Sequence, residues 1–148
     1  MSRAIVAAIL AAASLMSPIG LAQEATHAVQ HEPSDVDAPP KGHWMAPAAM
    51  AKRPNPIKPT AHSIERGRQL FQTLCATCHG DSGQGDGPGG ENLDPRPANL
   101  ATMAPHHRDG DLAWKIAQGR GAMPGWEQTL KPEDIWSVVN YLRVLAKR

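Results

Sequence analysis

The stretch TLCATCHGDSGQGDGPGG, residues 73–90, decides how the rest of the chain is interpreted. Cys75 and Cys78 stand three positions apart, His79 follows at once, and a glycine-rich segment comes after. Two sulfurs and an imidazole this close together are typical of three kinds of site: a zinc knuckle, a redox dithiol, or an attachment site for c-type haem. The remainder of the sequence discriminates between them.

Haem is the interpretation that the rest of the sequence favours. A structural zinc site needs four ligands, and the spare histidines form no second pair at suitable spacing. A redox dithiol belongs to a βαβ pattern, which is missing, and a disulfide across so small a loop would add little stability. In C-x-x-C-H the two thiols bond to the haem vinyl groups and the histidine ligates the iron. We therefore expect one covalent haem c, attached through Cys75 and Cys78, with His79 as an axial ligand.

Residues 1–22 have the organisation of a secretory signal peptide. Arg3 gives a short basic region, residues 4–16 are apolar, and Gly20-Leu21-Ala22 forms a small-x-small cleavage site. The alternative is an uncleaved anchor, but the run is shorter than the roughly 20 residues that a span needs. We expect cleavage after Ala22 and export to the periplasm, with no transmembrane span in the mature chain.

Residues 23–62 are expected to form a proline-rich, extended leader. Seven prolines lie between residues 23 and 60, and proline fixes φ and removes a backbone donor. Trp44 and Met45 interrupt this segment and are costly to leave in water. They either dock on the domain or on a partner, or they are stray apolar residues in a linker. The folded domain is expected to cover residues 63–148.

The charge of the chain argues against a nucleic-acid partner. The full sequence has 15 Lys and Arg residues against 14 Asp and Glu residues. Loss of Arg3 with the signal peptide leaves 14 of each sign, so the mature chain is formally neutral. Nucleic-acid binding normally requires a basic face.

Three main helices are predicted after the leader, and the sequence shows no strand pattern. The first covers residues 64–77 with Ser63 as N-cap, and the second covers residues 111–118 and ends at Gly119. The third covers residues 132–146, where apolar side chains recur at i, i+3, i+4 and i+7. Residues 80–110 are predicted to be loop. So few short helices supply too small a core for the domain, and a large apolar cofactor would fill it.

The second axial ligand must come from a distant part of the chain. The segment GRGAMPGW, residues 119–126, places Met123 in a tight loop between the second and third helices. A thioether there could face the haem opposite His79, and Met/His ligation raises the reduction potential and leaves no open coordination site. In the alternative, Met123 only fills the core, and the ligand is Met103, His106 or His107.

Four further residues are candidate haem contacts. Arg96, Asn99 and Arg120 are possible partners of the haem propionates, because charge-assisted hydrogen bonds suit carboxylates. Trp126 either lies against the haem or shields a propionate. The alternative for each is an ordinary surface or core position.

Taken together, these residues resemble the class I cytochromes c, which are small monohaem electron carriers. The resemblance covers residues 63–148 and includes Gly67 and Phe71 ahead of CATCHG, the pair Met123-Pro124, and the final helix with Tyr141. It implies an all-α fold of about three main helices and long loops around one covalent haem. It also implies that Gly67 lets the first and last helices approach, and that Phe71 packs on Tyr141.

The resemblance implies a carrier of single electrons between redox partners in the periplasm, not an enzyme. A second hypothesis makes the chain the haem subunit of a larger dehydrogenase, oxidase or reductase, with the leader as a docking strap. A third, a haem enzyme or sensor with an open iron, requires Met123 to be unbound. Pro88, Pro95 and Pro97 are the candidates for the proline whose carbonyl orients the axial histidine.

Overall fold

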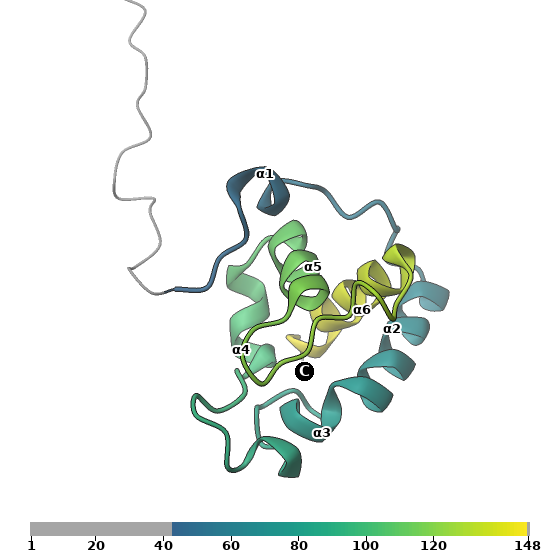
Figure 1. Cartoon of the computed structure of the whole chain (residues 1–148). Helices are drawn as coiled ribbons and strands as arrows, with labels where there is room; N and C mark the ends of the chain where they lie inside the picture. The colour runs from purple at the N-terminus through teal and green to yellow at the C-terminus, as the bar shows by residue number, and fades with distance from the viewer. Residues whose placement is uncertain (1–42, 148) are drawn as a thin grey trace, which may run out of the picture. The chain divides into compact units, whose positions relative to one another are not determined.

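The computed structural model describes residues 43–147 (Figure 1). The predicted signal peptide and the leader up to residue 42 lie outside the described residues. Within the described residues there is no β-strand, only an isolated bridge between Arg120 and Met123, and the predicted all-α architecture is confirmed. The elements are α1 (Ala48–Ala51), α2 (Ala61–Leu74), α3 (Ala76–His79), η2 (Pro88–Gly90), α4 (Leu100–Met103), η3 (Ala104–His106), α5 (Asp109–Gln118) and α6 (Pro132–Leu145).

Helix α2 begins earlier than the sequence pattern predicts. Its N-cap is Thr60, whose Oγ1 accepts a hydrogen bond from the Ser63 backbone amide at 3.2 Å. The Ser63 hydroxyl in turn accepts from the Thr60 amide at 3.0 Å. Ser63 is therefore the third residue of a capping box, not the cap itself. The helix ends at Leu74, and after Cys75 the chain continues as the short helix α3 up to His79.

Helices α2 and α6 pack closely where Gly67 lies. A Cβ atom at position 67 would lie 1.9 Å from the Ser137 carbonyl oxygen, so no larger residue fits without movement of one helix. Next to this crossing the rings of Phe71 and Tyr141 lie with their centroids 5.3 Å apart and tilted by 54°. This is a favourable arrangement for aromatic pairs. The predicted close approach at Gly67 and the predicted packing of Phe71 on Tyr141 are both observed.

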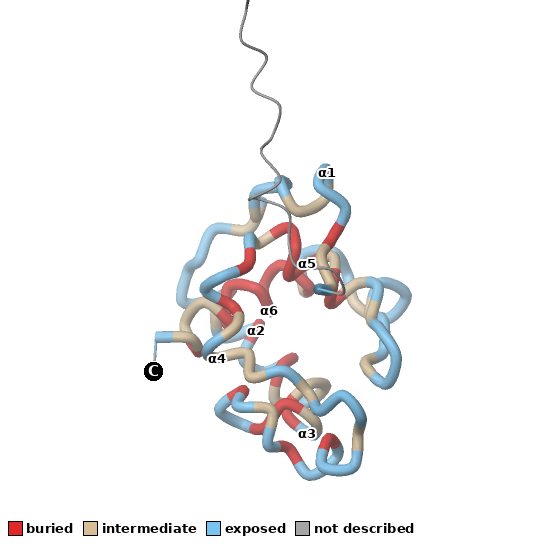
Figure 2. Tube along the Cα trace, turned by 90° about the vertical axis from the view of Figure 1, so that its left-hand side faces the viewer, coloured by how far each residue is buried: buried red, intermediate tan, exposed pale blue. Residues whose placement is uncertain are grey.

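Helix α6 forms the centre of the core. Its residues from Ile135 to Leu142 are all buried, and Figure 2 shows this helix almost wholly in the buried colour. Pro132 occupies the first turn, together with the acidic Glu133 and Asp134, as the sequence pattern predicts. Helix α5 ends at Gly119, whose φ of 66° is the left-handed conformation that glycine adopts most easily.

The segment predicted as loop, residues 80–110, contains η2, α4 and η3, and its last two residues already belong to α5, which begins at Asp109 and not at residue 111. Backbone hydrogen bonds fold its glycine-rich part back over α3: Gly85 N–H donates to His79 O at 2.8 Å, and Gly87 N–H donates to Cys78 O at 3.2 Å. A Cβ on Gly87 would lie 2.5 Å from the Thr77 carbonyl oxygen. The glycines therefore allow backbone to lie directly against backbone at the end of α3.

The described part of the leader lies against the helices. The Ala46 amide donates to Asp111 Oδ1 at 2.6 Å, and Asn55 Nδ2 donates to Asn140 Oδ1 at 2.9 Å. A Cβ on Gly110 would lie 2.2 Å from the Met50 carbonyl oxygen, so the leader and the first turn of α5 are in direct backbone contact. Figure 1 shows α1 beside α5. Residues 43–60 thus have fixed partners in α5 and α6, whereas the proline content alone predicts an extended segment.

Candidate functional site

A cavity of about 540 Å³ lies between α2, α5 and α6 and the loops that connect them. Its size is within the range of about 300–1,000 Å³ that is usual for small-molecule and cofactor sites. The walls are mainly apolar, and the apolar side chains include Phe71, Leu74, Leu100, Leu112, Ile116, Trp126, Val138 and Leu142. The cavity therefore suits a large apolar group that would complete the core.

Cys75 and Cys78 both line this cavity, and neither forms a disulfide. Burial, with a smaller contribution from the neighbouring Cys78, raises the pKa of the Cys75 thiol to about 11. A thiol with a raised pKa reacts poorly in disulfide exchange, because the thiolate is the attacking form. No cluster of three or more His, Cys, Asp or Glu side chains suited to a metal ion occurs within residues 43–147. These observations favour thioether attachment over the zinc and dithiol alternatives.

His79 ends α3 and directs one ring nitrogen into the cavity. Its Nδ1 lies 3.0 Å from the Ala98 carbonyl oxygen. Because a carbonyl can only accept, Nδ1 carries the hydrogen and Nε2 keeps its lone pair. Burial lowers the pKa of His79, which keeps the ring neutral, although the Ala98 hydrogen bond opposes that shift. The imidazole is therefore held in the form that ligates a metal.

The carbonyl that orients His79 differs from the candidates drawn from the sequence. It belongs to Ala98, and none of Pro88, Pro95 and Pro97 provides this contact. Ala98 directly follows Pro97, so the loop was correctly identified but the residue within it was not. Which carbonyl faces the ring depends on the path of the loop in space, which the proline positions do not determine.

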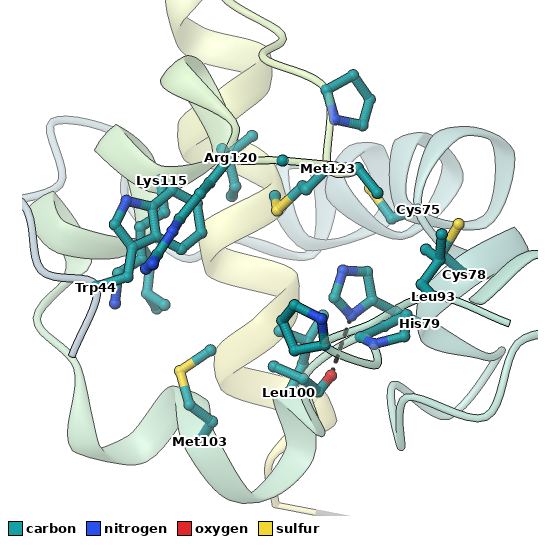
Figure 3. Close-up of a pocket in the computed structure, with 18 of the residues that line it drawn as sticks. Trp44, Cys75, Cys78, His79, Leu93, Leu100, Met103, Lys115, Arg120 and Met123 are labelled. Atoms are coloured by element: carbon teal, nitrogen blue, oxygen red, sulfur yellow. Dashed lines mark hydrogen bonds between the residues drawn. The ribbon is translucent and has the colours of Figure 1, made fainter. Parts of the chain in front are cut away.

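Met123 reaches the cavity from the loop between α5 and α6. The loop is closed by two backbone hydrogen bonds between Arg120 and Met123, of 2.9 and 3.0 Å. Gly119 and Gly121 flank Arg120 with φ values of 66° and 59°, so the turn depends on glycine. In Figure 3 the Met123 side chain and the His79 ring point toward one another across the cavity. Two ligands of one metal could come from these facing walls.

The alternatives to Met123 as iron ligand, which are Met103, His106 and His107, lie at different positions relative to the cavity. His106 is exposed and does not line the cavity. His107 lines it, and its Nδ1 lies 2.5 Å from Asp111 Oδ2, a contact that engages Nδ1 and not Nε2. Met103 also lines the cavity, from α4, at a place well separated from Met123 in Figure 3. Met123 and Met103 are thus the two methionines that an experiment must distinguish.

Of the four weaker predictions, three lie at the cavity. Arg96, Arg120 and Trp126 are part of its lining. Asn99 is not, because its side-chain oxygen accepts a hydrogen bond from the Thr102 amide at 3.1 Å and caps α4. An Asn before a helix is a common N-cap, and this signal was available in the sequence.

Among the polar and aromatic lining residues, the structure adds three that the sequence interpretation did not assign to the haem site: His43, Trp44 and Lys115. Two signals could have indicated them. An exposed Trp44 is unfavourable in water, and residues 107, 111 and 115 follow one another at helical spacing with charged or polar side chains.

The comparison with known families supports a specific assignment. Residues 62–142 match the family described as cytochrome c oxidase, cbb3-type, subunit III. The chain belongs to this cytochrome c family. The matched range includes the CATCH segment and Met123, and the cofactor of the cytochrome is covalently bound haem c. The residues present fit this group, since the cavity has apolar walls, two free thiols, and a neutral imidazole with an available nitrogen.

Several curated proteins are similar to the cytochrome. It is 29% identical over 97 residues to the quinohemoprotein alcohol dehydrogenase ADH IIB of Pseudomonas putida, which covers 66% of this chain and 13% of the relative. It is 29% identical over 141 residues to the cbb3-type cytochrome c oxidase subunit FixP of Bradyrhizobium diazoefficiens. This alignment covers 89% of this chain and 47% of the relative. It is also 29% identical over 82 residues to cytochrome c6 of Tetradesmus obliquus. This alignment covers 51% of this chain and 83% of the relative. The chain thus spans less than half the length of the first two relatives.

A solved structure supports the fold alone. A chain of the reducing HAO-like protein complex of Kuenenia stuttgartiensis superimposes with a TM-score of 0.54 at 23% identity, covering 61% of the cytochrome and 46% of that chain. Among residues 43–147, no helix has both the length and the apolar character to cross a membrane.

Proposed function

We propose that this cytochrome is a monohaem electron carrier of the bacterial periplasm that passes single electrons between redox proteins. In this proposal Cys75 and Cys78 would hold the haem through thioether bonds, and His79 and Met123 would ligate its iron. One observation carries the proposal: the lone pair of His79 Nε2 and the Met123 thioether face each other across the cavity. With both axial positions filled by the chain, no coordination site is left for a substrate.

The bound haem iron supplies one-electron Fe(III)/Fe(II) chemistry. The side chains around it set how easily that electron is taken up. The Ala98 carbonyl fixes the His79 tautomer, and the Met123 thioether and the apolar walls favour the less charged, reduced state. These residues exclude water and hold the ligands still, which suits transfer without chemistry on a substrate.

The proposed location and partners follow from the mature chain. A cleaved signal peptide at residues 1–22 would deliver the protein to the periplasm, where haem c is attached in bacteria. A carrier of this kind meets its redox partners through small, transient interfaces. The match to cytochrome c6, over 83% of that relative's length, is consistent with a carrier of one domain.

The ligand assignment is tested by the variants Met123→Ala and Met103→Ala. Met123→Ala should lower the midpoint potential, abolish the sulfur-to-iron absorption band of the oxidised protein, and let the reduced protein bind carbon monoxide. The reason is that a neutral thioether donor is lost and a coordination position is opened. Met103→Ala removes a thioether from the same cavity and should leave all three properties as in the wild type.

If Met103→Ala changes these three properties and Met123→Ala does not, the iron ligand is Met103. Ready carbon monoxide binding by the wild-type protein would instead favour a haem enzyme or sensor with an open iron. Either result contradicts the proposed ligation. In the first case carbon monoxide binds only after Met103 is replaced, and in the second it binds the wild-type protein.

A second candidate function is that of a haem subunit in a larger redox complex. The observations in its favour are the family description, which names an oxidase subunit, and the similarity to FixP and to a dehydrogenase. Size-exclusion chromatography of the native periplasmic fraction distinguishes the two functions. A haem-containing species near the mass of the mature chain supports the free carrier, and elution only in a large complex supports the subunit.

A further inference from the structure

One end of the haem cavity is formed by residues that precede the family match. His43 and Trp44 both line the cavity, whereas the match begins at residue 62. The His43 ring stacks on His107 with centroids 5.6 Å apart and an angle of 13°. The Trp44 ring packs against Trp114 at 6.2 Å and 60°. Both leader side chains thus have defined partners around α5.

Two cations lie on the Trp44 ring. Lys115 Nζ is 5.7 Å from the ring centroid, and the Arg120 guanidinium carbon is 5.8 Å from it. Figure 3 shows these three side chains together on one side of the cavity, with Cys75 and Cys78 on the other. This end of the cavity is therefore cationic and aromatic.

The charges at this end do not cancel. Lys115 is only 6% exposed and is paired with Asp111, whose Oδ2 lies 2.7 Å from Nζ. His107 is neutral, because burial and then the charge of Lys115 lower its pKa. Arg120 forms no ion pair within the described residues. Arg120 is exposed, so its positive charge is solvated and is available to an anion bound at this end of the cavity.

Asp111 also fixes the leader in place. The residue is 1% exposed, and its Oδ1 accepts the hydrogen bond from the Ala46 amide at 2.6 Å. The contact of Gly110 with the Met50 carbonyl and the Asn55 hydrogen bond to Asn140 hold the chain on either side of α1. The position of His43 and Trp44 is therefore built into the domain, not left to a free linker.

We propose that residues 43–46, the strap, close this end of the cavity and, with Lys115 and Arg120, bind the two carboxylate groups of the haem. A haem carries its two propionates on the edge remote from its vinyl groups, and the vinyl edge would face Cys75 and Cys78. The inference rests on the proposed attachment at these two cysteines. It replaces Asn99, and makes Arg120, whose charge is not paired within the described residues, rather than Arg96 the principal carboxylate partner.

The first test is Trp44→Ala, with Met45→Ala as the matched control. Met45 is the next residue, is also partly buried, and does not line the cavity. Trp44→Ala should retain the covalent haem by mass spectrometry but show a lower midpoint potential, because water that enters stabilises the more charged ferric state. Met45→Ala should match the wild type. An unchanged potential in Trp44→Ala would overturn the role of the strap.

The second test compares Arg120→Met, Arg120→Lys and Arg96→Met. Reduced-minus-oxidised infrared spectra of protein carrying carbon-13-labelled propionates report the carboxylate groups directly. The labelled bands should shift in Arg120→Met, stay in place in Arg96→Met, and be restored in Arg120→Lys. A shift in Arg96→Met alone would overturn the assignment. If the wild-type protein carries no added haem mass, the proposed function fails instead, which is a separate result.

Discussion

At the scale of single residues, Asp111 connects the leader to the haem cavity. Its carboxylate contacts the Ala46 amide, His107 and Lys115. Burial raises the pKa of Asp111, but the hydrogen bonds from Lys115 and from the Ala46 amide outweigh that effect, and the net shift is downward. The ionised carboxylate thus adds stability above its unfolded pKa, and this contribution is lost as the pH falls through the folded value.

His107 predicts a pH dependence of stability with a definite sign. Its pKa lies below the ordinary value of 6.5, because of burial first and the charge of Lys115 second. Below about pH 6.5 the unfolded chain therefore binds a proton that the folded protein does not, and the free energy of unfolding decreases as the pH falls. The expected slope is at most about 1.4 kcal/mol per pH unit for one proton.

This prediction is checked by urea unfolding of the haem-loaded protein at pH 7 and pH 5. His107→Gln cannot titrate and should show a smaller loss of stability between the two pH values than the wild type. The exposed neighbour gives the control, and His106→Gln should keep the wild-type slope. Equal slopes in His107→Gln and the wild type would show that His107 does not contribute.

At the scale of elements, the crossing of α2 and α6 is the contact that sets the fold. Gly67 permits it, and the pair of Phe71 and Tyr141 fills the space beside it. Because protein interiors are close-packed, even one added carbon at such a contact has to displace backbone. The crossing also positions the end of α2, where Cys75 and Cys78 begin the haem site.

Gly67→Ala should destabilise the protein by about 1–3 kcal/mol, the usual cost of overpacking. The measurement is the free energy of urea unfolding of the haem-loaded variant at pH 7. Gln69→Ala, an exposed position on the same helix, should change it by less than about 0.5 kcal/mol. A Gly67→Ala protein as stable as Gln69→Ala would mean that the two helices can separate without cost.

The elements that could be predicted from sequence were those with local signals. The bounds of α6 were predicted to within one residue, because Pro132 and the apolar periodicity lie within the helix itself. The short α4 and η3 were missed, because three or four residues carry no periodicity and distant contacts stabilise them. One such contact is the hydrogen bond from the Leu100 amide to the Gly83 carbonyl, at 2.6 Å.

The residues of the candidate site likewise fall into those with a local sequence signal and those without one. The residues placed by motif, namely Cys75, Cys78, His79 and Met123, all line the cavity. Trp44 and Lys115 were not assigned to it, because their neighbourhood depends on contacts such as Ala46 with Asp111, which are 65 residues apart. A pairing between a proline-rich leader and a helix so far along the chain has no local signal.

At the scale of the whole molecule, the haem completes the interior. The cavity of about 540 Å³ lies against α6, the most buried helix. Its walls are mainly apolar, and covering them with an apolar group removes them from water, which stabilises by about 25 cal/mol for each Å². Whole domains have free energies of unfolding of only about 5–15 kcal/mol. We therefore expect the domain to be stably folded only when the haem is bound.

The double variant Cys75→Ala/Cys78→Ala tests this dependence. Without covalent attachment the chain should give little folded protein, because the group that fills the cavity is no longer retained. Near-ultraviolet circular dichroism and resistance to protease, measured beside the wild type, report the loss. A cooperative, protease-resistant fold without haem would contradict it.

The strap also has a practical consequence for protein engineering. A version of the cytochrome that starts where the family match starts, at residue 62, keeps the attachment motif and Met123 but lacks the indole that lies under Lys115 and Arg120. It also removes the amide donor from a carboxylate that is almost wholly shielded from water. Fusion enzymes or electrode coatings built from this cytochrome should therefore begin no later than His43, because homology marks a shorter unit than the one that folds.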